Sequence, residues 1–85
     1  MYKQNLQFNI IFRPEPEGGF TVIVPSLPGC VTYGETLENA KKMAIDAIIG
    51  YIASLRKHNE PIPASDEQSF ISTVSITDNK KINYA

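Results

Sequence analysis

The sequence has no tryptophan, one cysteine and one histidine, and its net charge is only −1. A single cysteine cannot form an internal disulfide, which suits a reducing compartment. Cys30 and His58 lie in unrelated segments, so they do not have the ligand spacing of a metal site. The balanced charge leaves no basic field for attracting phosphate backbones. We therefore expect no metal, no cofactor and no DNA binding by this chain alone.

Long hydrophobic runs are also missing. The longest near-apolar stretch, residues 44–55, contains Asp46, Gly50 and Ser54 and is too short to span a bilayer. The first five residues have no apolar run behind them, so no signal peptide is expected. The composition predicts a soluble, cytoplasmic protein with one domain over residues 1–77 and a polar tail over residues 78–85. A chain of 85 residues buries a small core, which a second copy would enlarge.

The hydrophobic pattern predicts four strands and one helix. Apolar residues alternate over residues 6–12, 20–24 and 70–76, and residues 30–33 form a short β-branched and aromatic run between glycines. Thr36 is a suitable N-cap for a helix that ends near His58, before Pro61. The order β-β-β-α-β predicts the α+β class, with one helix covering one face of the sheet.

Catalysis is not expected from this pattern. A metal-dependent nuclease needs several carboxylates that converge on Mg²⁺, but none of the predicted strands contains an acidic residue. His58 lies among basic residues at a helix end, where it suits the helix dipole better than general-base chemistry. Cys30 follows a glycine in a strand, so we interpret it as a small buried thiol rather than a nucleophile. The chain is therefore predicted not to be an enzyme.

Two segments are candidates for binding. The loop Pro25-Ser26-Leu27-Pro28 contains two prolines, which lower the entropy cost of ordering it. It is either a tight link between two strands or a rigid recognition surface, and both can hold together. Ile45, Ile49 and Ile52 form a second apolar stripe on the predicted helix. This stripe is either core or a surface for self-association into a dimer or tetramer.

A set of motifs over residues 12–76 resembles the HicB family of antitoxin-like proteins. The resembling elements are Gly18-Gly19-Phe20, Val24-Pro25-Ser26-Leu27-Pro28-Gly29-Cys30, Tyr33-Gly34-Glu35-Thr36 and Pro61-Ile62-Pro63. The family typically has aspartate where Ser26 stands and often where Glu35 stands. The first difference removes an acidic group from the loop, whereas the second keeps the charge.

This resemblance implies a partial RNase H-like fold and a partner. HicB-like proteins usually bind a small basic HicA-type toxin, an mRNA-cleaving ribonuclease with an active-site histidine, and mask its active site. Glu35 and Glu38 are plausible contacts for a basic toxin, although acidic groups near a helix N-terminus also compensate the helix dipole. Many members carry a C-terminal DNA-binding module, for which the tail over residues 78–85 is too short.

The leading functional hypothesis is therefore an antitoxin-like binding protein that neutralises a HicA-type toxin. The alternative is a solitary structural or ligand-binding domain of the same fold, whose partner is unknown. A nuclease is a distant third hypothesis.

Overall fold

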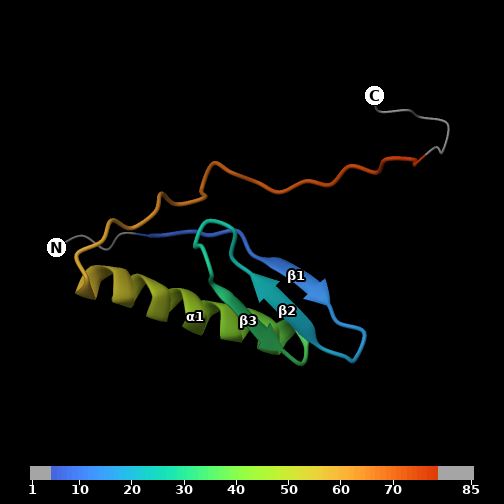
Figure 1. Ribbon diagram of the computed structural model, residues 1–85, viewed down its shortest axis with the longest axis horizontal. Helices are drawn as coiled ribbons and strands as arrows, with labels where there is room; N and C mark the ends of the chain where they lie inside the picture. The colour runs from blue at the N-terminus through green and yellow to red at the C-terminus, as the bar shows by residue number, and fades with distance from the viewer. Residues whose placement is uncertain (1–4, 79–85) are drawn as a thin grey trace.

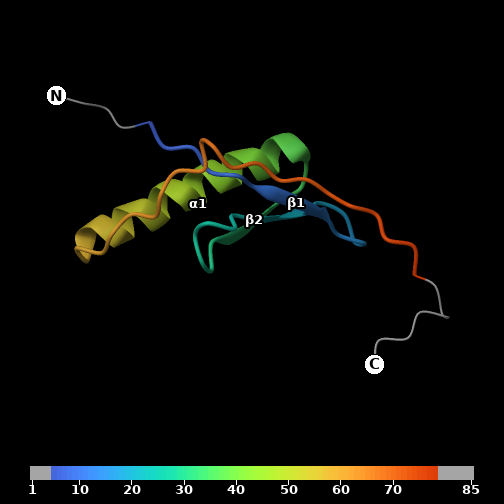
Figure 2. The same ribbon diagram turned by 90° about the horizontal axis from the view of Figure 1, so that it is seen from above.

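The computed structural model describes residues 5–78 and shows one helix packed on a small sheet (Figure 1). The elements are β1 (Ile11–Pro14), β2 (Phe20–Ile23), β3 (Val31–Gly34) and α1 (Leu37–Lys57). The strands are antiparallel neighbours in the order β1-β2-β3. Seen from above, α1 covers one face of this sheet (Figure 2). The predicted α+β class is thus confirmed for three strands and a helix.

The core lies between the sheet and α1. Side chains alternate between the two faces of a strand, and Val22 of β2 is fully buried against Ala40 and Ala44 of the helix. Ile10, Phe12 and Phe20 pack around this cluster. Side chains on the opposite face of the sheet are more exposed. Val31 and Tyr33 keep 56% and 48% of their solvent-accessible area. One face of the sheet is therefore not covered by the described residues.

The helix begins and ends where its cap residues predict. The Thr36 hydroxyl accepts a hydrogen bond from the Asn39 backbone N–H at 3.0 Å. The Asn39 side chain accepts one in return from the Glu35 N–H at 3.1 Å. At the other end, His58 is the C-cap residue and its Nδ1 lies 2.8 Å from the Ser54 carbonyl oxygen. The predicted N-cap at Thr36 and the predicted helix end near His58 are both confirmed.

A second buried cluster lies beside the first, beneath the loop between β2 and β3. Val24, Leu27 and Cys30 form its centre and are at most 5% exposed. The partly buried side chains around it come from the start of the chain and from the helix: Phe8, Ile10, Ala47, Ile48 and Tyr51. The loop is therefore part of the core as well as a connection.

The first strand is shorter than predicted. Periodicity indicates a strand over residues 6–12, but regular pairing starts only at Ile11, opposite Ile23. β2 ends at Ile23, immediately before the turn at Val24 and Pro25, so residues 6–10 have no neighbour on that side. Phe8 and Ile10 still pack into the core. The alternation of apolar residues thus predicts their burial correctly, although residues 6–10 form no hydrogen-bonded ladder with β2.

The predicted last strand is wrong for this chain. Residues 70–76 are extended but unpaired, and Phe70, Val74 and Ile76 are more than 80% exposed. An alternating segment becomes a strand only when it pairs with the edge of a sheet. β1 and β3 each have a free outer edge, but residues 70–76 pair with neither of them. The arrangement within the chain is therefore β-β-β-α rather than β-β-β-α-β. Of the predicted tail over residues 78–85, all but Asp78 lies outside the described residues.

No helix among the described residues is long and apolar enough to cross a membrane.

Candidate partner-binding site

The loop between β2 and β3 is held rigidly by its backbone. The Leu27 N–H donates to the Val24 carbonyl at 3.1 Å, and the Cys30 N–H donates to the Leu27 carbonyl at 2.9 Å. Leu27 is fully buried, so it anchors the loop from beneath. Pro25 and Pro28 are exposed and form the outer surface. The Tyr51 hydroxyl donates to the Pro28 carbonyl at 2.8 Å, which joins the loop to α1.

Ser26 points to an internal partner. Its hydroxyl lies 2.8 and 3.0 Å from the two carboxylate oxygens of Asp66, which is 8% exposed. The Asn9 N–H donates to the same carboxylate at 3.0 Å. Asp66 thus connects the proline loop, the segment before β1 and the chain beyond the helix. Ser26 is only half-buried, but its hydroxyl is engaged in this cluster.

Glu35 and Glu38 are exposed at the start of α1. Pairing of Phe20 with Gly34 places the β1–β2 hairpin at the same end of the sheet. That hairpin adds Glu17, which is exposed, and Glu15, whose carboxylate accepts a hydrogen bond from the Thr21 hydroxyl at 2.6 Å. We call Glu15, Glu17, Glu35 and Glu38 the acidic end. Sequence reasoning missed the two hairpin glutamates, although the short segment between the predicted strands over residues 6–12 and 20–24 contains both.

The structure does not bring the two predicted contact regions together. The proline loop precedes β3, and Glu35 follows it, so the regions lie at opposite ends of that strand (Figure 1). A strand of four residues spans about 13 Å. A partner that touches both regions must therefore extend along β3, where Val31 and Tyr33 are exposed.

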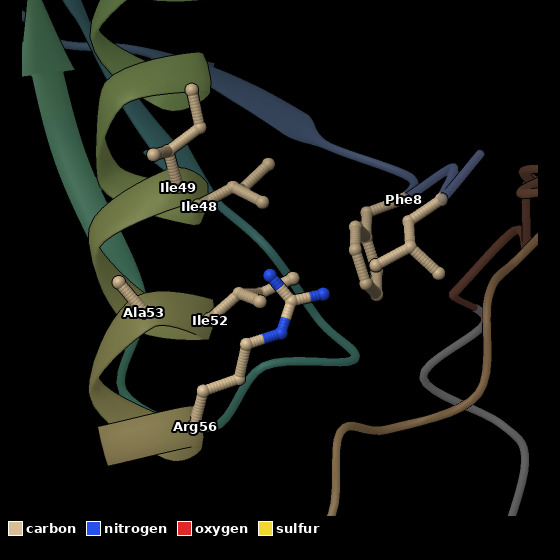
Figure 3. A pocket seen from close by; sticks show the side chains of 7 residues that line it. Phe8, Ile48, Ile49, Ile52, Ala53 and Arg56 are labelled. Carbon is tan, nitrogen blue, oxygen red and sulfur yellow. The ribbon is translucent and has the colours of Figure 1, made fainter. Parts of the chain in front are cut away.

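The predicted isoleucine stripe is divided by the fold. Ile52 is 7% exposed and belongs to the interior, whereas Ile45 and Ile49 are 51% and 62% exposed. Ile49 and Ile52 line a groove of about 350 Å³ between α1 and the segment before β1. The other lining residues are Leu6, Phe8, Ile48, Ala53 and Arg56. Figure 3 shows Phe8 facing Ile48 across this groove, with the Arg56 guanidinium between α1 and Phe8.

The titratable groups do not form a reactive cluster. Burial raises the pKa of the Cys30 thiol, which lowers its thiolate fraction and its reactivity. His58 is exposed at the helix end, as predicted. Among residues 5–78, no three His, Cys, Asp or Glu side chains are placed to hold a metal ion. The exposed surfaces described above are suited to binding another molecule.

Comparison with known proteins identifies a family. Residues 8–81 match the family described as HicB_like antitoxin of bacterial toxin-antitoxin system. The chain is 40% identical over 63 residues to the UPF0150 protein Ta0767 of Thermoplasma acidophilum, covering 74% of this chain and 91% of that protein. It is 34% identical over 64 residues to the UPF0150 protein ssr1765 of Synechocystis, covering 75% and 81% of the two chains.

A named antitoxin also matches. The chain is 37% identical over 60 residues to Antitoxin HicB 1 of Photorhabdus laumondii, covering 71% of this chain. The match spans only 39% of that antitoxin, so most of the longer protein has no counterpart in the aligned region.

Proposed function

Because this chain belongs to the HicB-like antitoxin family of bacterial toxin-antitoxin systems, we propose that it binds and neutralises a toxin protein. Membership of this family, matched over residues 8–81, is the observation that carries the proposal. The family is generally non-enzymatic and implies a toxin partner. We further propose that this partner is a HicA-type mRNA-cleaving toxin, and that the chain masks its active site.

The shape and charge of the surface support this proposal. A docking surface that is already ordered loses little conformational entropy on binding, and the proline loop is fixed by backbone hydrogen bonds and by buried Leu27. The acidic end complements the basic toxin that the family resemblance implies. We propose that Glu35 and Glu38, together with Glu17, steer that toxin, and that exposed Pro25 and Pro28 contact it. In this arrangement Ser26 and Leu27 support the loop from within.

A second candidate function rests on the relatives of similar length. The match spans 91% of the UPF0150 protein Ta0767, compared with 39% of Antitoxin HicB 1. We therefore keep as an alternative a solitary HicB-like domain that binds a ligand or partner other than a HicA-type toxin. The two functions differ in one testable respect, which is inhibition of a toxin ribonuclease.

The remaining features of the proposal concern assembly and location. We propose that the protein self-associates as a dimer or tetramer, because Ile45 and Ile49 stay exposed on α1 and a small core gains from a second copy. We propose a cytoplasmic location, where a toxin acting on mRNA would be met. We also propose that the sheet and helix belong to the partial RNase H-like fold that the resemblance implies.

Co-expression with the basic protein encoded by the neighbouring gene tests the function. That protein should arrest growth when expressed alone, and this chain should restore growth and co-purify with it. A chain with Glu17, Glu35 and Glu38 all changed to glutamine removes three charges from the acidic end. The matched control changes Asp46, Glu60 and Glu67 to their amides, which removes three exposed charges outside the acidic end. If both variants still rescue growth, the acidic end is not used. If the unmodified chain does not rescue growth, the antitoxin function is refuted.

A further inference from the structure

The segment after the Asp66 cluster carries an apolar face that no part of residues 5–78 covers. Phe70, Val74 and Ile76 have the same parity in an extended chain, so their side chains point to one side. They are 86%, 85% and 81% exposed. Three large apolar side chains at this exposure on one side of a short segment, with only Ser72 between them, are unusual for a small folded domain. Exposed apolar patches of this kind mark interaction sites. We call residues 70–78 the extended arm.

The groove beside α1 is the counterpart on the same molecule. Its walls are apolar, and Ile49 at its rim is 62% exposed. Its length along the helix, from Ile48 to Arg56, is about 12 Å, which four extended residues span. Phe70 to Val74 of an arm therefore fit the length of the groove.

The arm does not point at the groove of its own chain. Hydrogen bonds hold its base beside the segment before β1, where the Asp66 N–H donates to the Gln7 carbonyl and the Asn9 side chain lies 3.5 Å from the Ser69 carbonyl oxygen. From there the arm runs past β1, toward the hairpin end of the sheet (Figure 1). The groove lies toward the opposite end, beside the C-terminal half of α1. Reaching it within one chain would require the arm to reverse direction at its anchored base.

The charge pattern of the arm also suits the groove. Residues 70–77 carry no charge, so they can enter an apolar groove without burying a charged group. Asp78 follows Val74 by about 13 Å in an extended chain and would remain in solvent.

We propose that the extended arm of one copy occupies the groove of a second copy, and that the second arm returns the contact. This inference rests on the self-association proposed above and names its interface. A two-fold arrangement uses the same arm and groove on both subunits, so each apolar contact is made twice. A buried phenylalanine alone covers about 150–250 Å². Phe70 thus supplies a part of the roughly 800 Å² per partner that a standard interface buries.

Disulfide trapping distinguishes exchange between copies from folding back within one chain. Ala53 is exposed in the groove and Val74 lies on the apolar side of the arm. Full-length Ala53→Cys protein is mixed with a mass-tagged Val74→Cys protein and oxidised. Cys30 is buried in both proteins and should form no disulfide as long as they are folded. The mixed disulfide should be the main product. Replacing Val74→Cys by Thr73→Cys, on the other side of the arm, should lower its yield at least fivefold.

The strength of association gives a second readout without any cross-link. Val74→Lys should weaken dimerisation by about a hundredfold, because the two-fold arrangement loses one apolar contact in each subunit. Thr73→Lys is the matched control and should change it less than threefold. Circular dichroism of each variant verifies that the fold is intact.

Three results would overturn the exchange: a monomer at about 50 µM, a disulfide within one chain when both cysteines are combined, or an unchanged dimer in Val74→Lys. None of these measurements includes a toxin. Failure of the exchange therefore leaves toxin neutralisation to stand on its own test, and failure of neutralisation leaves the exchange intact.

Discussion

At the scale of single residues, Ser26 shows how one hydroxyl can replace a charge. Its hydroxyl donates to the Asp66 carboxylate at 2.8 Å, and the Asn9 N–H donates to the same carboxylate at 3.0 Å. The family resemblance places an aspartate at this loop position, and here the nearby carboxylate comes instead from the segment after the helix. One carboxylate with two donors is well satisfied, whereas two facing carboxylates would repel each other.

We predict that Ser26→Asp destabilises the protein by about 1–3 kcal/mol near neutral pH. A second carboxylate raises the pKa of the pair in the folded state above that in the unfolded chain. The stability loss should therefore grow as pH rises through the carboxyl range and shrink as pH falls to about 4. Urea unfolding at both pH values measures it. The double variant with Asp66→Asn should recover most of the loss; an equal loss at both pH values would contradict the repulsion.

At the scale of elements, the contact between β3 and α1 depends on Gly34. A Cβ placed at this residue would overlap the backbone of Ala40, the first fully buried residue of the helix. Ala40 and Ala44 are themselves small, so the helix lies close to the strands. The close spacing of the sheet and the helix thus depends on glycine and alanine residues at their contact.

Gly34→Ala should cost about 1–3 kcal/mol in the free energy of unfolding, because the strand and helix must move apart to admit the methyl group. The matched control is Gly50→Ala, in the middle of α1, where the new Cβ meets nothing within 4 Å. That change should stabilise the protein by about 0.5–1 kcal/mol. Thermal unfolding compares the two. Similar melting temperatures for both variants would show that the close approach at Gly34 is not important.

The elements that depend on local chemistry could be predicted from the sequence. The Thr36 cap, the end at His58, the strand around Val22 and the buried Cys30 each follow from a residue and its neighbours. Residues 70–76 could not be predicted in this way. Their alternation indicates one apolar face, but a strand must also pair with the edge of a sheet, and no local pattern says whether this segment reaches one.

The candidate site shows the same limit. The sequence indicates a stiff loop at Pro25 and Pro28, but not that Ser26 bonds to Asp66, 40 residues away. Likewise, the isoleucine stripe is uniform in sequence, yet Ile52 is buried and Ile49 is exposed. The difference arises because the segment before β1 approaches only part of α1, which is a property of the fold.

At the scale of the whole molecule, charge is unevenly distributed although the net charge is only −1. The acidic end lies where α1 begins, and Arg56, Lys57 and His58 lie where it ends. Such a distribution can orient a basic partner during approach even when the net charge is small.

We predict that Glu35→Lys slows association with the cognate toxin by about threefold or more, since surface charges act mainly on the association rate. Glu60→Lys, which makes the same change beyond the far end of α1, should have little effect. Stopped-flow or surface-based kinetics at low and high salt measure both, and the difference should shrink as salt rises. Equal rates for the two variants at low salt would exclude steering by the acidic end.

We also expect this chain alone not to retard its own promoter DNA at sub-micromolar concentration and physiological salt. The net charge of −1 gives no net attraction to the phosphate backbone, because nine acidic residues balance eight Lys and Arg residues. An electrophoretic mobility assay with a scrambled duplex as control tests this, and specific retardation would reveal a basic surface formed on assembly.

The most direct test of the central claim is the rate at which the purified basic neighbour protein cleaves a labelled mRNA as this chain is added. The antitoxin function predicts that cleavage falls linearly and stops near an equimolar ratio, while the chain alone cleaves nothing, with or without Mg²⁺. Cleavage that continues at a tenfold excess of folded chain would contradict that function and favour the solitary domain.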